Sequence, residues 1–420
     1  MNIREFESLS HSGADWTGAF ERAAQSAKES GGGVITVPAG VYYTHGIQLY
    51  SGTTLFVEAG ARIAFLDDEE RRKVIDSEFE GIPEKAYMPC VYAKGAENVH
   101  IKGDGTLDGQ GEKWWQRHLK GENKFARPYL ICFDECKNVS VEGVTLTNSP
   151  VWTIHPLRCD GVCIRAVTIK NPSNSPNTDG IDPNASRNVR ISDTTIDVGD
   201  DCIAIKSGTE STPVKSPCEN IIITNCHMLH GHGGVVIGSE MSGGVRNVLV
   251  SDCIFSETDR GIRLKTRRAR GGAEENLMFR DILMDGVISP VVFNMFYFCG
   301  KDGKLKRVWD KAEYPVDETT PSVHDVTISG ITAKRCRSCA GFFYGLPESP
   351  IERVTLKEIN IEMARGAEPE RPAMMDDCPA LAGAGFYLRN ARDVLLTDVQ
   401  LGGLSGEMFD ADKSVTFREA

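Results

Sequence analysis

The chain has 420 residues, a formal net charge of −12 and 42 glycines, a glycine content that suits a fold with many turns. The acidic balance argues against nucleic acid as a partner, and no run of about 18 apolar residues, the length needed to cross a membrane, occurs in the sequence. A chain of this length would make about two or three ordinary domains, whereas a solenoid grows without splitting.

The first predicted element is a helix from Trp16 to about Ser30. Apolar residues recur there with helical spacing, and the glycines at 31–33 end the pattern. We expect a cap over the first coil of a solenoid, within about residues 12–30, that hides open strand edges; an ordinary surface helix is the alternative. Because no apolar run precedes this helix, we expect a cytoplasmic protein, or a secreted one if a leader has been trimmed off. The apolar face consists of Phe20, Ala23, Ala24 and Ala27.

A weak repeat follows and recurs along most of the chain. Each copy has a polar residue or Gly, then Val or a similar residue, any residue and an aliphatic residue, as in Asn188-Val189-Arg190-Ile191. Apolar and polar residues alternate within each copy, which predicts strands. The central copies are roughly 23–32 residues apart, whereas propeller blades need about 40 or more. Copies begin at Asn98, Asn138, Gly161, Asn188, Asn220, Asn247, Asn276, Asp325, Arg353 and Asp393.

Stacking is the way in which such coils bury their apolar faces, because no coil can do so alone. The sequence therefore predicts an all-β fold, a right-handed parallel β-helix. We expect one domain over residues 1–420, with coils from about 34 to 415. The repeat spacing stretches at about residues 66–95, 110–128 and 300–322, which predicts long insertions beside the coils.

The 13 cysteines are an odd number, and several fall in or beside predicted strands. Cys226 and Cys253 each lie six residues after their repeat asparagine, so we expect them to stack in adjacent coils. Reduced thiols packed in the interior are the preferred interpretation over disulfides. Cys336 and Cys339 form a single Cys-x-x-Cys without a second pair, and the role of that pair stays open.

Four short clusters fall in register within the repeat. They are Asn177-Thr178-Asp179, Gly199-Asp200-Asp201, Gly231-His232-Gly233 and Arg263-Leu264-Lys265. Neighbouring coils lie about 4.8 Å apart and successive strand side chains face opposite ways. The clusters are therefore expected to meet on one outer face, with Ile181, Ile203, Val235 and Ile262 forming an aliphatic ladder inside.

Three carboxylates, a histidine and two cations at one place suit acid/base chemistry on an anionic substrate. Carboxylates this crowded cannot all ionise freely, so at least one pKa should rise. One protonated and one ionised carboxyl group is what glycoside hydrolysis needs. The alternative is that the aspartates merely cap turns.

The ordered set of four resembles the signature motifs of the polygalacturonases, glycoside hydrolase family 28, of the bacterial exo-acting type. The likeness extends through Asp104 to Gly111 and Ser149 to Pro156, and covers about residues 12–400. The resemblance implies a right-handed parallel β-helix, hydrolysis of α-1,4 bonds between galacturonates, inversion at the anomeric carbon, and neither metal nor cofactor. It departs from the family at Leu264, where Ile is more usual; this residue should face the core.

The resemblance also implies roles for the motif residues. Asp200 would be the general acid, and Asp179 and Asp201 would hold and deprotonate the attacking water. His232 would tune or hydrogen-bond this group. The implied substrate-binding residues are Arg263, Lys265, Asn177, His155, Lys206 and Tyr297.

An anionic substrate must be attracted by local cations, because the chain as a whole is acidic. Arg263 and Lys265 fit this role, and the cations at 267, 268 and 270 are left undecided. Exo-hydrolysis is expected, since long loops can turn a cleft into a pocket. A rhamnogalacturonan or xylogalacturonan hydrolase, a calcium-dependent pectate-lyase-like eliminase and a non-catalytic carbohydrate-binding β-helix are the alternatives. Neither a membrane nor a nucleic-acid partner is expected, and oligomeric state and tolerance of esters and branches are left open.

Overall fold

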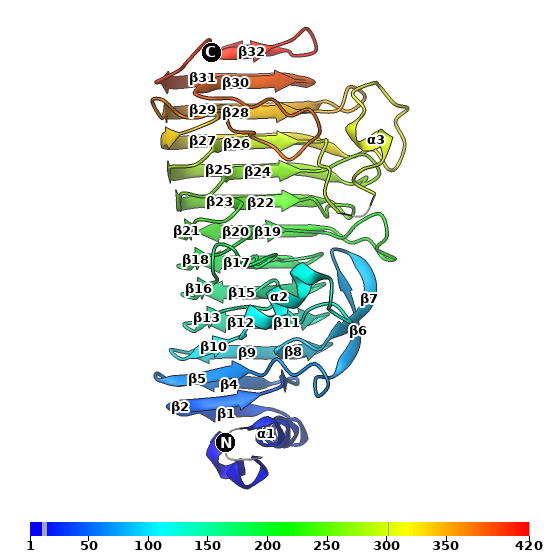
Figure 1. Cartoon of the computed structure of the whole chain (residues 1–420), viewed down its shortest axis with the longest axis vertical. Helices are drawn as coiled ribbons and strands as arrows, with labels where there is room; N and C mark the ends of the chain where they lie inside the picture. The colour runs from blue at the N-terminus through cyan, green and yellow to red at the C-terminus, as the bar shows by residue number, and fades with distance from the viewer. Residues whose placement is uncertain (11–14, 301, 420) are drawn as a thin grey trace. The chain divides into compact units, whose positions relative to one another are not determined.

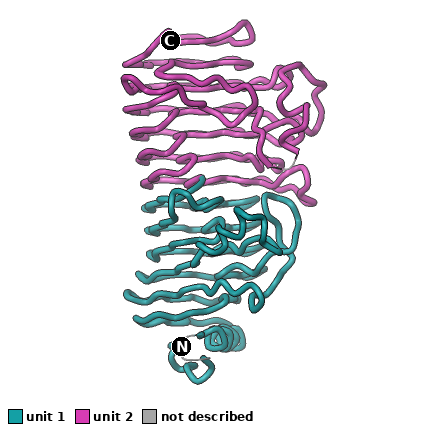
Figure 2. Tube along the Cα trace, in the orientation of Figure 1, with its two compact units in different colours: residues 1–200 teal, residues 201–420 magenta. Residues whose placement is uncertain are grey.

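The computed structural model describes residues 1–10, 15–300 and 302–419. The chain divides into two compact units, Met1–Asp200 and Asp201–Ala420, which are described separately (Figure 2). The expectation of one domain over the whole chain stays a prediction. No helix within the described residues is long and apolar enough to span a membrane.

Unit 1 begins with two short helical elements, η1 (Ile3–Leu9) and α1 (Thr17–Glu29). The predicted N-terminal helix is confirmed by α1, although positions 12–14 of the expected cap lie outside the described residues. The helix contacts the first strands of the unit, β1 to β4, and so covers the first coil. Its buried residues include the whole predicted stripe: Ala19, Phe20, Ala23, Ala24 and Ala27.

The strands of unit 1 run in parallel stacks, with each coil placed in register on the coil before it (Figure 1). One stack runs β1–β4–β9–β12–β15–β17, a second β2–β5–β10–β13–β16–β18, and a third β3–β8–β11–β14. The bounds are β1 (Gly33–Val37), β2 (Gly40–Thr44), β3 (Ile47–Gln48), β4 (Thr53–Val57), β5 (Ala61–Phe65), β6 (Val74–Phe79), β7 (Ile82–Tyr87), β8 (Val91–Lys94), β9 (Glu97–Gly103), β10 (Thr106–Asp108), α2 (Glu112–Lys120), β11 (Ile131–Asp134), β12 (Lys137–Glu142), β13 (Thr145–Thr147), β14 (Ile154–Leu157), β15 (Asp160–Arg165), β16 (Thr168–Lys170), β17 (Arg187–Ser192) and β18 (Thr195–Asp197).

Unit 2 continues the same construction with longer strands. One stack contains β20, β21, β23, β25, β27, β29, β31 and β33, and the other runs β19–β22–β24–β26–β28–β30–β32, all parallel. The bounds are β19 (Asp201–Ile205), β20 (Cys218–Thr224), β21 (His227–Leu229), β22 (Gly233–Gly238), β23 (Val245–Ser256), β24 (Arg260–Lys265), β25 (Ala273–Asp285), β26 (Ser289–Asn294), α3 (Lys306–Trp309), β27 (Ser322–Cys336), β28 (Cys339–Tyr344), β29 (Ile351–Met363), β30 (Ala384–Arg389), β31 (Ala391–Gly402), β32 (Phe409–Ala411) and β33 (Phe417–Glu419).

Coils whose equivalent strands pair in parallel make a parallel β-helix, as predicted. Crossovers between parallel strands of one sheet are right-handed in about 98% of cases, and the predicted handedness follows. The expected aliphatic ladder is confirmed in unit 2, where Ile203 pairs with Val235 and Val235 with Ile262, all fully buried. Leu264 is also fully buried, as its position predicted.

The polar residue that begins each repeat has a positive φ, for example 57° at Asn98 and 58° at Asn188. This left-handed region is accessible to asparagine and aspartate and is costly for most other residues. Asparagine side chains of successive coils also bond to one another. Asn138 Nδ2 donates to Asn98 Oδ1 at 2.6 Å, and Asn276 Nδ2 donates to Asn247 Oδ1 at 2.7 Å.

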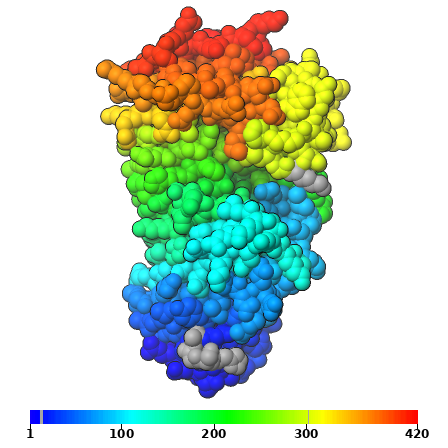
Figure 3. Space-filling view, viewed as in Figure 1, coloured from blue at the N-terminus to red at the C-terminus, as the bar shows by residue number. Residues whose placement is uncertain are grey.

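The predicted insertions carry structure of their own. In unit 1, β6 and β7 form an antiparallel hairpin, and the segment after α2 pairs with it through Ala86 and Ala126. The rings of Tyr87 and Phe125 meet there at 5.5 Å. Figure 3 shows the hairpin and the α2 segment, in light blue and cyan, covering the coils of unit 1 beneath them. The expected insertion at about 300–322 contains α3, and its residue 301 lies outside the described residues.

All 13 cysteines lie in the described part of the chain and are free thiols. The expected stacking of Cys226 and Cys253 is confirmed, because the residues after them, His227 and Ile254, pair in register. Burial raises the pKa of Cys339 to about 12, and the pKa of Cys336 likewise to about 12. These two thiols are therefore protonated at neutral pH.

Candidate active site

Thr178 joins the two acidic motifs of unit 1. Its buried hydroxyl lies 2.5 Å from Ser175 Oγ and accepts a hydrogen bond from the backbone N–H of Gly199 at 3.3 Å. Asp179 directly follows Thr178 and is buried, whereas Asp200 directly follows Gly199 and is partly exposed. A single threonine thus fixes the backbone in front of both aspartates.

Arg127 lies beside these motifs and was not predicted from the sequence. Its buried guanidinium donates to the carbonyl oxygens of Pro150 at 3.0 Å and Pro176 at 2.8 Å. It also donates to Asn177 Oδ1 at 2.7 Å, so the amide of Asn177 positions this arginine. Arg127 lies in the predicted insertion at 110–128. The stretched repeat spacing there was the one sequence feature that could have pointed to this residue.

Burial lowers the pKa of Arg127 to about 10, against the opposing effect of nearby acids. Those acids are Asp179, Glu80 and Asp200, and their charges favour the ionised guanidinium. Arg127 therefore stays a cation at neutral pH. It supplies positive charge to the acidic motifs from the side of the insertion.

Asp201 is the centre of the site in unit 2. Its Oδ2 accepts from Lys265 Nζ at 2.6 Å and its Oδ1 accepts from Arg263 Nη1 at 3.1 Å. The Asp201 side chain is 1% exposed. Burial opposes ionisation, but Lys265, Arg263 and Lys206 outweigh it and hold the pKa of Asp201 far below its ordinary value. The expected rise in pKa therefore does not occur at Asp201, which is an ionised carboxylate.

Two of the predicted catalytic carboxyl groups lie close together in unit 1, where one oxygen of Asp179 lies within 4.8 Å of one oxygen of Asp200. Asp201 directly follows Asp200 in the chain and begins unit 2. Oxygen donors at this spacing could hold a hard cation. Two protein cations already neutralise Asp201, so an ion is not needed to balance its charge.

Lys206 has a different environment from the predicted one. It was expected to line the groove, but it is 3% exposed and lies 3.4 Å from Glu240, itself buried. Burial acts to raise the pKa of Glu240, but the charges of Lys206, Arg270 and Lys265 together help to lower it below its ordinary value. Glu274 is fully buried near Lys265, and burial raises its pKa well above the ordinary value. This buried network supports the strand ends beneath the site.

Arg263 and Lys265 share an aromatic neighbour, Tyr297. Its ring centroid lies 5.7 Å from the guanidinium carbon and 5.2 Å from Lys265 Nζ. Arg263 Nη2 also contacts Met374 Sδ at 3.1 Å, and Asn294 donates to the Met374 carbonyl at 3.2 Å. The loop between β29 and β30 therefore lies against Arg263. The sequence did not predict this contact, because the repeat is absent from that loop.

The three neighbouring cations that the sequence left undecided are bound by acids. Arg267 contacts Glu210 at 2.7 Å, and Arg270 pairs with the same carboxylate. Arg268 contacts Glu348 at 2.5 Å. All three arginines are buried. They hold loops of unit 2 in place.

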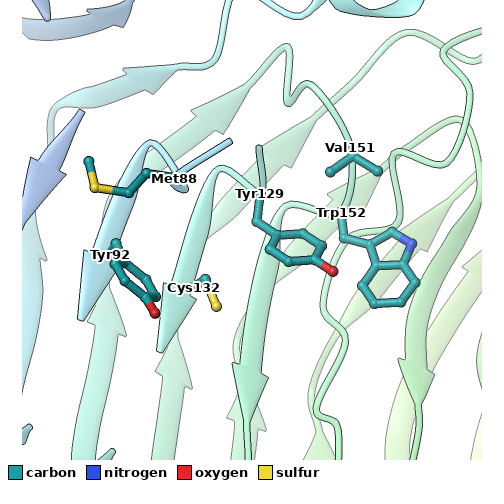
Figure 4. Packing of buried hydrophobic residues seen from close by; sticks show 6 residues of the cluster. All are labelled: Met88, Tyr92, Tyr129, Cys132, Val151 and Trp152. Atoms are coloured by element: carbon teal, nitrogen blue, oxygen red, sulfur yellow. The ribbon is translucent and has the colours of Figure 1, made fainter. Parts of the chain in front are cut away.

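His155 lies on the outer face of its strand, as predicted, but an aromatic cluster covers it. It is fully buried, its Nδ1 lies 2.9 Å from the Asp182 carbonyl, and its ring is 4.6 Å from Tyr129. Phe79 of the hairpin packs on Trp152 at 5.2 Å. Figure 4 shows the buried cluster, which consists of Met88, Tyr92, Tyr129, Cys132, Val151 and Trp152.

His232 is exposed in the bend just before β22. The next residue, Gly233, pairs with Asp201 in register, so His232 lies next to the coil position that carries the ionised carboxylate. A Cβ at Gly233 would come within 2.5 Å of Val236 Cγ2. Glycine at this position therefore leaves room for the Val236 side chain.

The chemical capacity of the arrangement follows from its unequal carboxyl groups. Asp201 is buried and ionised, Asp179 is buried, and Asp200 is partly exposed in the same cluster. Carboxyl groups in different environments can divide the roles of proton donor and proton acceptor. Lys265 has three N–H donors and donates one of them to Asp201.

Comparison with known proteins agrees with this chemistry. The family described as "Glycosyl hydrolases family 28" matches residues 35–374. A probable polygalacturonase of Vitis vinifera is 32% identical over 365 residues, which cover 84% of this chain and 72% of that protein.

Two solved structures are also similar to this chain. The hyperthermoactive exopolygalacturonase of Thermotoga maritima has a TM-score of 0.80 at 30% identity, covering 96% of this chain and 91% of that one. The polygalacturonase from Erwinia carotovora ssp. carotovora has a TM-score of 0.70 at 26% identity, covering 92% and 95%. In the sequence comparison, the chain spans between 46% and 75% of the length of the polygalacturonases that it matches.

Proposed function

The chain belongs to glycosyl hydrolases family 28 and is a glycoside hydrolase, and we propose that it cleaves α-1,4 bonds between galacturonates with inversion at the anomeric carbon. The observation that carries the proposal is the acidic cluster with its ion-paired member, Asp201. An ionised carboxylate beside a partly exposed one supplies the base and the acid that glycosidic hydrolysis requires.

In the proposed reaction, Asp200 donates a proton to the glycosidic oxygen as the bond to the anomeric carbon breaks. Asp179 and Asp201 hold a water molecule and accept its proton as its oxygen bonds to that carbon. Lys265 and Arg263 hold Asp201 ionised before the proton is transferred. His232, at the start of the neighbouring strand, hydrogen-bonds the reacting group.

An anionic substrate is supported by the two neighbouring cations, Arg263 and Lys265. A lysine has three N–H donors, and Lys265 donates one of them to Asp201. The remaining donors can bind the carboxylate of a uronate in the groove. Tyr297 then orients both cations from their other side.

Attack at a chain end is supported by the covered face of unit 1. The hairpin β6–β7 and the segment after α2 lie over the outer surface of β8, β11 and β14, and they bury His155. A groove closed by such a cover admits the end of a chain rather than its middle. The Thermotoga maritima protein, which is similar along nearly the whole chain, is an exopolygalacturonase.

The test is NMR of the first product released from trigalacturonate. We expect free galacturonate, with inverted configuration at the new anomeric centre. Retained configuration would overturn the proposed water attack, and early mixed oligomers from polygalacturonate would overturn exo-action.

Asp200→Asn tests the assignment of the acid. The change should lower kcat by the ~10²–10⁴ typical of losing a general acid, with unfolding by urea unchanged. Turnover close to that of the wild type would show that another group donates the proton.

We also propose that the protein works in the cytoplasm. The free state of its 13 cysteines, most of them buried, suits a reducing compartment. Fractionation of the source cells, followed by assay of each fraction, tests this. Activity confined to the medium would contradict it.

A further inference from the structure

The loop between β29 and β30 reaches two neighbouring strands of unit 2 through one residue, Met374. Arg263 Nη2 donates to the sulfur of Met374 at 3.1 Å, and Asn294 Nδ2 donates to the carbonyl oxygen of the same residue at 3.2 Å. Asn294 pairs in register with Lys265. Met374 therefore lies where β24 carries both of its cations.

The loop holds Met374 in place independently of Arg263. Arg260 donates to the carbonyl oxygens of Arg371 at 3.0 Å and Pro372 at 2.9 Å, just before Met374 in the chain. Met375, which follows it, is 1% exposed. Contacts on both sides thus fix the position of the sulfur.

The acceptor that the loop offers to Arg263 is uncharged. A thioether sulfur is a weak acceptor, so it orients an amino group of the guanidinium without neutralising the charge. The neighbouring arginines have charged acceptors: Arg267, Arg268 and Arg270 contact Glu210 or Glu348. The loop also carries Asp376 and Asp377, whose charges act on Lys311. A neutral residue thus stands at the loop position that contacts Arg263, two residues before an acidic pair.

The charges of unit 2 around this contact are unevenly shared. Arg263 and Lys265 donate to the single carboxylate of Asp201. The cations beside them have acids of their own, in the ion pairs Lys206–Glu240 at 3.4 Å and Arg260–Asp259 at 3.1 Å. Glu274 adds no charge at neutral pH, because burial raises its pKa well above the ordinary value. Two cations therefore share one carboxylate, and an acid in place of Met374 would remove this difference.

We propose that Met374 is a positioning residue for substrate binding, which holds the Arg263 guanidinium toward the carboxylate of a uronate and, being uncharged, leaves the charge of that guanidinium to the substrate. The inference rests on the proposed function and deepens it, because it assigns part of the preference for an anionic substrate to a loop outside the repeat. Met374 acts through Arg263 and takes no part in bond cleavage.

Steady-state kinetics with trigalacturonate test this role. Met374→Glu should pair with Arg263 and raise KM at least about tenfold, the loss of one charge-assisted contact, while kcat stays within about threefold of the wild type. Met374→Leu, which fills similar space without an acceptor, should raise KM about threefold, the loss of one weak hydrogen bond. Met374→Gln keeps an uncharged acceptor, so its KM should stay within about twofold.

Met278→Glu is the matched control for the charge, because Met278 is 43% exposed on β25, and its KM should equal that of the wild type. Calorimetric titration in the Asp200→Asn chain separates binding from turnover. There Met374→Glu should weaken binding of trigalacturonate about tenfold. It should leave binding of the methyl-esterified trisaccharide unchanged, since the ester has no charge for Arg263 to bind.

A KM for Met374→Glu within about twofold of the wild type would overturn the proposal. An equal rise in Met278→Glu would also overturn it, because the effect would then be one of overall charge. The same holds for an equal rise in Met374→Gln, which would trace the effect to packing. Turnover of trigalacturonate by the wild type judges the proposed function separately: an inactive wild type would refute that function, and the titration would still decide the role of Met374.

Discussion

Replacing Asp201 by asparagine removes the charge on which two buried cations depend. Lys265 Nζ at 2.6 Å and Arg263 Nη1 at 3.1 Å both donate to this carboxylate, and the three side chains are between 1% and 7% exposed. Asparagine keeps the shape but leaves Lys265 and Arg263 without the charge that they face. Breaking a buried ion pair from one side costs about 3–5 kcal/mol, so we expect the free energy of unfolding to fall by that amount.

Glu219→Gln provides a matched control in the same unit. Glu219 accepts from Arg246 Nε at 2.7 Å, a distance like those at Asp201, but these side chains are 19% and 47% exposed. A solvent-exposed pair contributes ~1 kcal/mol or less. Urea unfolding of both variants, followed by circular dichroism, compares the two ion pairs at equal geometry and unequal burial.

Equal losses in the two variants would refute the reasoning, because burial would then have no part in the strength of the Asp201 pair. A double-mutant cycle with Lys265→Met refines the test. The double variant should lose less than the sum of the single losses, since removing the lysine relieves the charge that Asp201→Asn leaves unpaired. Strict additivity would show that the two residues do not interact.

Two further predictions concern unit 2 and the thiols. Lys311 lies 3.6 Å from the Phe296 ring, and burial lowers its pKa from 10.5 to about 8. Below about pH 8 the buried Lys311 is charged, and this lowers the free energy of unfolding by its full amount. The effect vanishes as pH rises to about 10.5, where the unfolded chain also loses this proton. Lys311→Met should thus be more stable than the wild type at pH 7 and lose this advantage by pH 10 in urea unfolding; a gap that stays constant would contradict the shift. Of the 13 thiols, the partly exposed Cys163 and Cys299 should react with a thiol reagent at pH 8 and the rest only after unfolding; fast reaction of more than these two would contradict their burial.

The fold could be predicted because its signals are local and repeated. A left-handed turn selects asparagine, aspartate or glycine, and alternation within a strand selects the buried side. Both constraints recur in every coil, so Asn98, Asn188 and Asn276 report the same backbone geometry. The register of Ile203, Val235 and Ile262 followed from counting residues after those turns.

The site was only partly predictable, because several of its contacts come from segments outside the repeat. Arg127 belongs to the α2 insertion and Met374 to the loop between β29 and β30, and no periodicity places either one. The register of Lys206 was predicted correctly, but its burial was not. Its ammonium lies 3.4 Å from Glu240, a buried residue on another coil. Likewise, His155 faces outward as expected, but it is covered by the aromatic rings of Tyr129 and Trp152.

The hydrogen bonds between asparagine side chains of successive coils limit where the chain can change its length. An extra residue within a strand would turn the later side chains of that strand to the opposite face. It would also separate pairs such as Asn247 and Asn276. Insertions and deletions are therefore tolerated mainly in the segments that cover the coils, such as 66–87 and 364–383. A change of length in those segments alters what covers the coils and leaves the stacked strands in register.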